Sequence, residues 1–185
     1  MAQRFKYSMA AKVLQAGGLV AYPTEAVYGL GCDPHNHDAL RALLALKRRS
    51  PAMGLIVISH SIDTALNYID SPSDELVQKL QDSWPGPNTW IVKAQNLNEL
   101  VTGGRETVAL RVSAHPVCQQ LCAAFGDVLV STSANVSGKP PATNLLQLRR
   151  QFPKGIDHIV GGALGNSSRP TQIMDASTGE VLRRG

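Results

Sequence analysis

Short apolar runs alternate with longer segments whose apolar residues recur every three or four positions along most of the 185-residue chain. Runs rich in β-branched residues predict buried strands, and the three-to-four periodicity predicts amphipathic helices. We expect strands at 19–23, 54–59, within 83–94, at 107–112, at 128–130 and around 159–160, and a final hairpin over 171–185. We expect helices at 8–16, from Asn36 or Asp38 to the basic run 47–49, and at 61–69, 72–83, 116–125 and 144–152.

The alternation of strands and helices predicts one α/β domain over residues 1–185, with three layers and a mixed sheet. A chain of this length buries about two-thirds of its unfolded surface, so it needs no disulfide or metal to fold. Side chains suited to helix starts support three of the boundaries. We expect Ser8 and Thr143 to act as caps and Pro72 to occupy the first helical position.

The strand at 107–112, with the sequence TVALRV, directs its side chains alternately to two faces. Its aliphatic residues at 108, 110 and 112 share one face, so Arg111 lies on the other face with Thr107 and Ala109. A half-buried arginine in mid-strand is costly unless it meets an anion. Because the chain has only 14 acidic residues, we favour a ligand carboxylate or phosphate over an internal ion pair as that anion.

Small hydroxyl side chains follow the strand at 128–130, in the stretch VLVSTSANVSGKPPAT. Ser131, Ser133 and Asn135 are too small to fill a core but are rich in hydrogen-bonding groups. Open α/β sheets bind ligands at the carboxyl ends of their strands, so we expect a phosphate near these residues. The alternative is a serine-threonine turn whose hydroxyls bond only to their own backbone.

Thr24 and Glu25 also follow a strand directly, within PTEAVYGLGCDP. We expect them to face the same crevice as Ser131, and the alternative is a turn with a solvated carboxylate. The two glycines of YGLG do not form a dinucleotide fingerprint, because position 34 is a proline where a third glycine would stand. We therefore exclude a Rossmann cofactor site.

Three adjacent cations, Lys47, Arg48 and Arg49, end one predicted helix. Basic residues at a helix C-terminus complement the helix dipole, but three are more than a cap needs. We therefore consider an anionic ligand near this helix end as well. His35 and His37 could suggest a metal, but no third ligand is spaced to join them, so we expect no metal site.

The charge and composition of the chain narrow its partners and its compartment. A net charge of +4 and a pI of about 9.1 favour polyanions such as nucleotides or RNA. No apolar run approaches the ~20 residues of a membrane span, and the N-terminus lacks the apolar stretch of a secretory signal. The three cysteines have neither zinc-ligand nor CxxC spacing. We therefore expect a cytoplasmic protein with no membrane contact.

Five stretches, PTEAVYGLGCDP, LKRRSP, SWPGPNT, ALRVSAHP and STSANVSGKPPAT, together make a specific signal. In their order and separations the sequence resembles the YrdC-like threonylcarbamoyl-AMP synthases, in their short single-domain form, over nearly the whole chain. The resemblance implies a twisted mixed sheet with a concave, positively charged face, a fold shared with a riboflavin-pathway synthase of the RibB type. It also implies a nucleotidyltransferase reaction, in which L-threonine, bicarbonate and ATP give threonylcarbamoyl-adenylate and pyrophosphate.

The resemblance implies site residues in two groups. Those similar to nucleotide contacts are Lys47, Arg49, Thr107, Ser133, Asn135, Thr143 and Arg183. Those similar to threonine contacts are Thr24, Arg111, Ser131 and Thr171. Lys47 and Arg49, which match the family's Lys-x-Arg motif, would also act in catalysis by offsetting charge on the departing pyrophosphate.

The sequence departs from the family pattern in three places. Ser50 stands where a proline commonly follows the arginine of Lys-x-Arg, and Met53 stands where a lysine is frequent. The segment TQIMD at 171–175 replaces the common STVVD. The last difference bears directly on Thr171 as a threonine contact.

Further partners follow from the resemblance. Mg²⁺ would accompany ATP, held mainly by the nucleotide and water. A separate threonylcarbamoyl-transferase complex would then modify adenosine 37 of tRNAs that read codons starting with A. The alternative function is an RNA-binding module whose basic face holds tRNA or double-stranded RNA. A riboflavin-type synthase is a third, but we find no metal-binding acidic cluster around Glu25 and Asp33.

Overall fold

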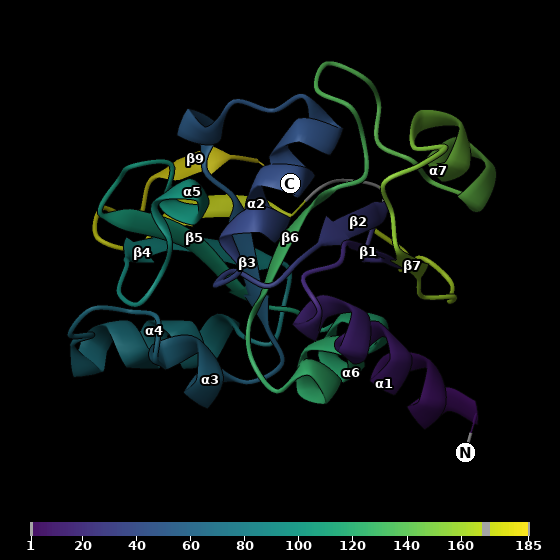
Figure 1. Ribbon diagram of the computed structural model, residues 1–185. Helices are drawn as coiled ribbons and strands as arrows, with labels where there is room; N and C mark the ends of the chain where they lie inside the picture. The colour runs from purple at the N-terminus through teal and green to yellow at the C-terminus, as the bar shows by residue number, and fades with distance from the viewer. Residues whose placement is uncertain (1, 168–170, 185) are drawn as a thin grey trace.

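The strands of the protein form one mixed sheet of nine strands in the computed structural model, which describes residues 2–167 and 171–184 (Figure 1). The strand order is β7-β1-β2-β6-β3-β5-β4-β8-β9. The strands are β1 (Val20–Pro23), β2 (Tyr28–Gly31), β3 (Ile56–Ser59), β4 (Asn88–Lys93), β5 (Thr107–Val112), β6 (Leu129–Ser133), β7 (His158–Ile159), β8 (Gln172–Asp175) and β9 (Val181–Arg183). The predicted α/β class and mixed sheet are therefore confirmed.

Two helical layers cover the two faces of this sheet. On one face, α2 (His37–Lys47), α3 (Ile62–Leu66), α4 (Asp74–Ser83), α5 (Glu99–Thr102) and α7 (Leu145–Gln151) contribute to a core that includes Val57, Leu110 and Val130. On the other face, α1 (Ala2–Gln15) and α6 (Pro116–Phe125) lie side by side and bury Tyr22, Ile58 and Leu129 (Figure 1). None of these described helices is long and apolar enough to cross a membrane.

The register of the three central strands brings two predicted site residues to one face. β3 runs antiparallel to β6 and pairs Ile56 with Ser131, and it runs parallel to β5 and pairs Ile58 with Arg111. Paired residues on neighbouring strands point to the same side of a sheet, and so do residues two apart on one strand. Ser131 and Arg111 therefore share the face that α1 and α6 cover in part.

Three of the expected helix starts are wrong. The first helix begins at Ala2, so Ser8 lies inside it, and α4 is capped by Ser73 rather than begun by Pro72. The last helix is capped by Asn144, whose side chain accepts a hydrogen bond from the Gln147 amide. Neighbouring hydroxyl, amide and proline residues offered several equivalent caps in each case, and spacing alone did not choose among them.

The strand β2 is not anticipated by the sequence, because YGLG looks like a turn. Its glycines are needed for close packing. A Cβ on Gly31 would stand 2.6 Å from the Val130 carbonyl oxygen, and one on Gly29 would stand 3.0 Å from Thr24 Cγ2. The side-chain-free backbone lets β2 pair with both β1 and β6, which brings the 24–27 connection next to β6.

Asn36 caps the helix that carries Lys47, and its Oδ1 accepts the Ala39 amide at 2.9 Å. We expect Asn36→Ala to lower the free energy of unfolding by about 1 kcal/mol, because one amide of the first turn loses its partner. Asn36→Asp keeps an acceptor oxygen and serves as the control. Urea denaturation of the three proteins measures the effect, and equal midpoints for Asn36→Ala and the unchanged protein would contradict it.

Candidate functional site

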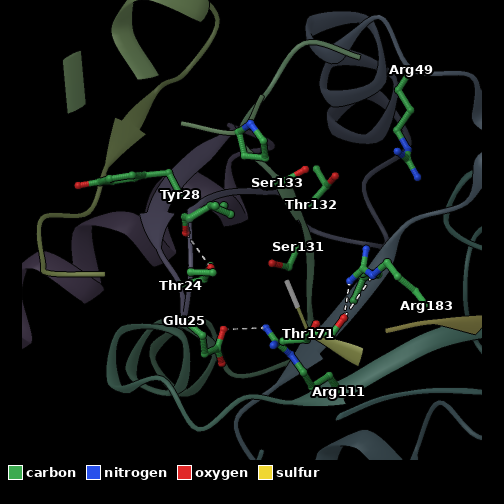
Figure 2. A pocket seen from close by; sticks show the side chains of 15 residues that line it. Thr24, Glu25, Tyr28, Arg49, Arg111, Ser131, Thr132, Ser133, Thr171 and Arg183 are labelled. Carbon is green, nitrogen blue, oxygen red and sulfur yellow. Dashed lines mark hydrogen bonds and ion pairs between the residues drawn. The ribbon is translucent and has the colours of Figure 1, made fainter. Parts of the chain in front are cut away.

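A pocket of about 350 Å³ lies on the face of the sheet that carries Ser131 and Arg111 (Figure 2). This volume falls in the range of about 300–1,000 Å³ that is usual for small-molecule sites. Of the residues predicted for the amino acid, it is lined by Thr24, Arg111, Ser131 and Thr171. Of those predicted for the nucleotide, it is lined by Arg49, Ser133 and Arg183.

Arg111 forms an internal ion pair with Glu25 across the pocket wall (Figure 2). The Nη2 to Oε2 distance is 3.1 Å, and the two side chains are only 6% and 18% exposed. Arg111 therefore has the internal partner that we did not favour, because the β1–β2 connection brings Glu25 to it, and its contact with a ligand stays a prediction. The alternative of a solvated carboxylate at Glu25 is wrong for the same reason.

Glu25 is held in its ionised form by its neighbours. Burial alone raises the pKa of this carboxyl, but the Arg111 guanidinium and the Ser113 hydroxyl outweigh it and lower the pKa below the ordinary value. Ser113 Oγ donates to Glu25 Oε1 at 2.6 Å. The pocket therefore contains a fixed negative charge.

Arg111 keeps donors that Glu25 does not use. Its Nε and Nη1 atoms are buried and have no hydrogen-bond partner within the described part of the chain. Unpaired buried donors are costly, and in native proteins they usually meet a ligand or an ordered water. Arg111 thus has hydrogen-bonding capacity for an anion in addition to Glu25.

Three hydroxyl residues predicted for threonine border the same pocket. Thr24 Oγ1 donates to the Val27 carbonyl at 2.7 Å, which fixes the tight connection between β1 and β2. Ser131 lies on β6 itself, so the hydroxyls begin inside the strand rather than after it. Thr171 Oγ1 lies 3.3 Å from Thr89 Oγ1, which ties the start of β8 to β4.

Lys47 lies behind the pocket rather than in its lining. The side chain is buried, and its Nζ donates to the Ser133 carbonyl, to the Asn135 carbonyl at 2.9 Å and to Asn135 Oδ1 at 3.5 Å. Burial, and to a lesser degree the charge of Arg49, lowers the pKa of Lys47 to about 8. In this structure Lys47 therefore holds the end of β6 in place, and Asn135 supports that contact.

Two arginines from different elements, Arg49 and Arg183, bring positive charge to the pocket. Arg49 follows α2 and donates from Nη2 to the Gly54 carbonyl at 3.0 Å. Arg183 comes from the edge strand β9 and donates from Nη2 to the Thr171 carbonyl at 2.8 Å. Burial lowers the pKa of both guanidinium groups, and for Arg183 the charge of Arg111 adds to this effect. With Arg111, these residues make the lining strongly cationic.

Besides Lys47 and Asn135, two more predicted nucleotide residues, Thr107 and Thr143, lie outside the lining of this pocket. Thr107 begins β5 and borders two neighbouring hollows, one of which also involves Arg49 and Arg183. Thr143 is exposed, and its hydroxyl donates to Gln147 Oε1 at 2.9 Å. Their predicted contacts with the nucleotide stay predictions.

Several lining residues were not assigned by the sequence. Glu25 was expected in the crevice but was given no role there, and Tyr28, Ile56, Thr132 and Pro141 were not predicted as site residues. Tyr28 belongs to the unpredicted strand β2, and Ile56 faces the pocket because it pairs with Ser131. The alternation of GLIVIS could have identified Ile56, whereas only the folded chain reveals that Glu25 meets Arg111.

The donor set of this pocket suits an anionic organic ligand better than a bare metal ion. Glu25 is the one carboxylate among the fifteen described lining residues, and it contacts Arg111 and Ser113. Across residues 2–167 and 171–184, no group of three histidine, cysteine or acidic residues could hold a metal. Guanidinium and hydroxyl groups bind carboxylates and phosphates.

Known proteins resemble this chain along its whole length. The family model Sua5_yciO_yrdC, described as "Telomere recombination", matches residues 12–185. A protein of Halorhodospira halophila is 49% identical over 97% of this chain and 95% of its own length, and one of Methylococcus capsulatus is 46% identical over 97% of both chains. A protein of Pseudomonas putida is 46% identical over 100% of both chains. All three are named threonylcarbamoyl-AMP synthase.

Solved structures show the same fold. A variant of P. abyssi Sua5 matches with a TM-score of 0.93 at 29% identity, over 98% of this chain and 57% of that one. P. abyssi Sua5 complexed with L-threonine matches with a TM-score of 0.91 at 28% identity, over 97% of this chain and 54% of that one. The present chain thus spans little more than half of the Sua5 structures, but nearly all of its curated relatives. These matches show that the chain belongs to the Sua5/YciO/YrdC family of YrdC-like threonylcarbamoyl-AMP synthases.

Proposed function

We infer that this chain is a threonylcarbamoyl-AMP synthase, a nucleotidyltransferase that uses ATP and L-threonine. Near full-length relatives at 46–49% identity carry that name. The observation that carries the inference is the convergence of Arg111, Ser131 and Arg49 from β5, β6 and the end of α2 on one pocket. A family resemblance without this convergence would leave the chain without a place for its substrates.

Arg111 is the residue that we propose for the carboxylate of L-threonine. Its spare donors support this role, because a guanidinium binds a carboxylate with strong, directional hydrogen bonds. The side chains of Thr24 and Ser131 line the same pocket as Arg111 (Figure 2). Their hydroxyls can contact the remaining polar groups of the amino acid. Fixing the amino acid in this way supplies the proximity that the reaction needs.

Arg49, Arg183 and Ser133 are the residues that we propose for the phosphates of ATP. These three residues line the side of the pocket that lies across from Glu25 (Figure 2). The two arginines are therefore not paired with the carboxylate of Glu25. Lys47 acts from behind, through Ser133 and Asn135, and its charge adds to the positive potential around the departing pyrophosphate. A single well-placed donor or cation is typically worth about 3–4 kcal/mol in such a transition state.

The proposed chemistry requires no nucleophile from the protein. The neutral amine of threonine attacks the carbon of bicarbonate, which gives a carbamate and releases water. A carbamate oxygen then attacks the α-phosphorus of ATP, and the bond to the departing pyrophosphate breaks. The buried thiols fit this proposal, because burial raises the pKa of Cys118 to about 12 and leaves it a poor nucleophile. The protein contributes positioning and charge.

Magnesium enters this proposal with the nucleotide. The described residues that line the pocket do not form a metal site, because they include a single carboxylate, that of Glu25. Mg²⁺ prefers to keep water and phosphate oxygens as ligands, so the phosphates of ATP would hold it. Bound there, it neutralises phosphate charge.

The product sets the place of the reaction in the cell. We propose that threonylcarbamoyl-adenylate passes to a separate transferase complex that modifies adenosine 37 of tRNAs reading codons that start with A. A tRNA-modification step favours a cytoplasmic location. Direct binding of tRNA or double-stranded RNA, and the positively charged concave face expected for it, stay predictions.

The activity is tested with purified protein, ATP, Mg²⁺, bicarbonate and each amino acid in turn. We expect pyrophosphate release that requires both bicarbonate and L-threonine, because the carbamate needs both. Release that is independent of threonine would contradict the proposal. Salt-dependent binding of duplex RNA on filters, together with no threonine-dependent turnover, would favour the RNA-binding module instead.

Lys47 gives the reaction a dependence on pH. Folding lowers its pKa to about 8, so the side chain is charged below that pH and neutral above it. Between pH 7 and 9 the charged fraction falls from about nine-tenths to about one-tenth. We expect the kcat/KM for ATP, relative to that of Lys47→Met at the same pH, to fall by up to about tenfold over this range.

The ratio to the variant cancels the titration of threonine and bicarbonate themselves. Lys47→Arg, whose guanidinium stays charged, should show no such fall relative to Lys47→Met. Circular dichroism confirms that each variant is folded, since Lys47 is buried. A ratio that stays constant from pH 7 to 9 would show that the charge of Lys47 does not contribute.

A further inference from the structure

Glu25 is the one described pocket residue whose charge has the same sign as that of the proposed phosphate ligands. Among the described residues that line the pocket, three are arginines and one is an acid. A site that bound only anions would gain from losing this carboxylate. Its retention inside the pocket therefore needs a separate reason.

The carboxylate is anchored from several directions. Its Oε1 accepts from Ser113 Oγ at 2.6 Å, and Ser113 Oγ in turn accepts from the His115 amide at 3.1 Å. Its Oε2 contacts Arg111 at 3.1 Å. The Glu25 backbone carbonyl accepts from the Ser167 amide at 3.1 Å, and a Cβ on Gly165 would stand 2.7 Å from the same oxygen. Glu25 is thus a fixed charge rather than a mobile side chain.

An amino acid is a zwitterion, so its two charged groups need two opposite partners within a short distance. Glu25 and Arg111 present such a pair at the same wall of the pocket (Figure 2). Arg111 lines the pocket, and its Nε and Nη1 have no hydrogen-bond partner in the described residues, so Glu25 does not exhaust the donors of Arg111. The oxygens of Glu25 retain lone pairs beyond those used by Ser113 and Arg111.

We propose that Glu25 binds the α-ammonium group of the amino-acid substrate while its ion pair keeps Arg111 oriented toward the substrate carboxylate. This inference rests on the proposed function and names the residue that distinguishes an α-amino acid from a hydroxy acid. Glu25 acts by binding and positioning. Held in its ionised form by Arg111 and Ser113, it is a weak base and does not take the proton that the amine loses on forming the carbamate.

The test compares two ligands that differ only in the amine. L-Threonine and 3-hydroxybutyrate, which is threonine without its α-amino group, are titrated by calorimetry into the full chain without ATP or bicarbonate. We expect Glu25→Gln to weaken threonine binding on the order of 10- to 100-fold, the factor for one charge-assisted hydrogen bond, and to leave 3-hydroxybutyrate binding nearly unchanged. Glu106→Gln, an exposed acid outside the pocket, is the matched control and should change neither.

A second variant guards against a folding defect. Glu25→Asp keeps the charge but withdraws the carboxylate by one methylene, so it should show the same threonine-specific loss to a smaller degree. If circular dichroism shows that Glu25→Gln is unfolded, the Glu25→Asp variant tests whether Glu25 binds the ammonium group. Threonine binding as tight as in the unchanged protein, or an equal loss for both ligands, would overturn the role of Glu25 at the ammonium group.

Pyrophosphate release by the unchanged protein distinguishes a failure of the inference about Glu25 from a failure of the proposed synthase function. If threonine-dependent release occurs and Glu25→Gln binds threonine normally, only the inference about Glu25 falls. If the unchanged protein neither binds threonine nor releases pyrophosphate in its presence, both the proposed function and the inference about Glu25 are wrong.

Discussion

The ion pair between Glu25 and Arg111 joins two parts of the chain that the sheet alone does not connect directly. Arg111 belongs to β5 and Glu25 to the β1–β2 connection, and the strands β2, β6 and β3 lie between them in the sheet. Two largely buried charges hold their positions only when they are paired, and removing one leaves the other uncompensated. The pair therefore fixes one wall of the pocket, while its unused donors and lone pairs leave that wall able to bind a ligand.

A second buried cation fixes the opposite wall. Lys47 extends from the last turn of α2 to the carbonyl groups of Ser133 and Asn135, so α2 and β6 cannot shift independently. Arg49, two residues further along, then reaches the pocket itself. Buried charged groups that hydrogen-bond to backbone carbonyls stabilise one arrangement over its alternatives. The site thus uses one lysine to hold the strand in place and the arginines to contact the ligand.

The sequence predicted most of the fold because its periodic segments are strongly amphipathic. TVALRV matches β5 over residues 107–112, and the alternation within it correctly placed Arg111 on the face opposite Val108, Leu110 and Val112. The strand β2 was missed because Gly29 and Gly31 serve close packing rather than a turn. The hydrogen-bond partners of Lys47 and the pairing of Glu25 with Arg111 could not be predicted, because the partner of a buried charge depends on which distant segments meet. Local spacing does not carry that information.

The most direct test of this account is a crystal structure of the protein with L-threonine bound. We predict that the threonine carboxylate lies within hydrogen-bonding distance of the Arg111 guanidinium, in the pocket bordered by Ser131, and that the Glu25–Arg111 ion pair remains intact. Threonine bound away from Arg111, or a Glu25 side chain displaced from Arg111 by the ligand, would contradict it.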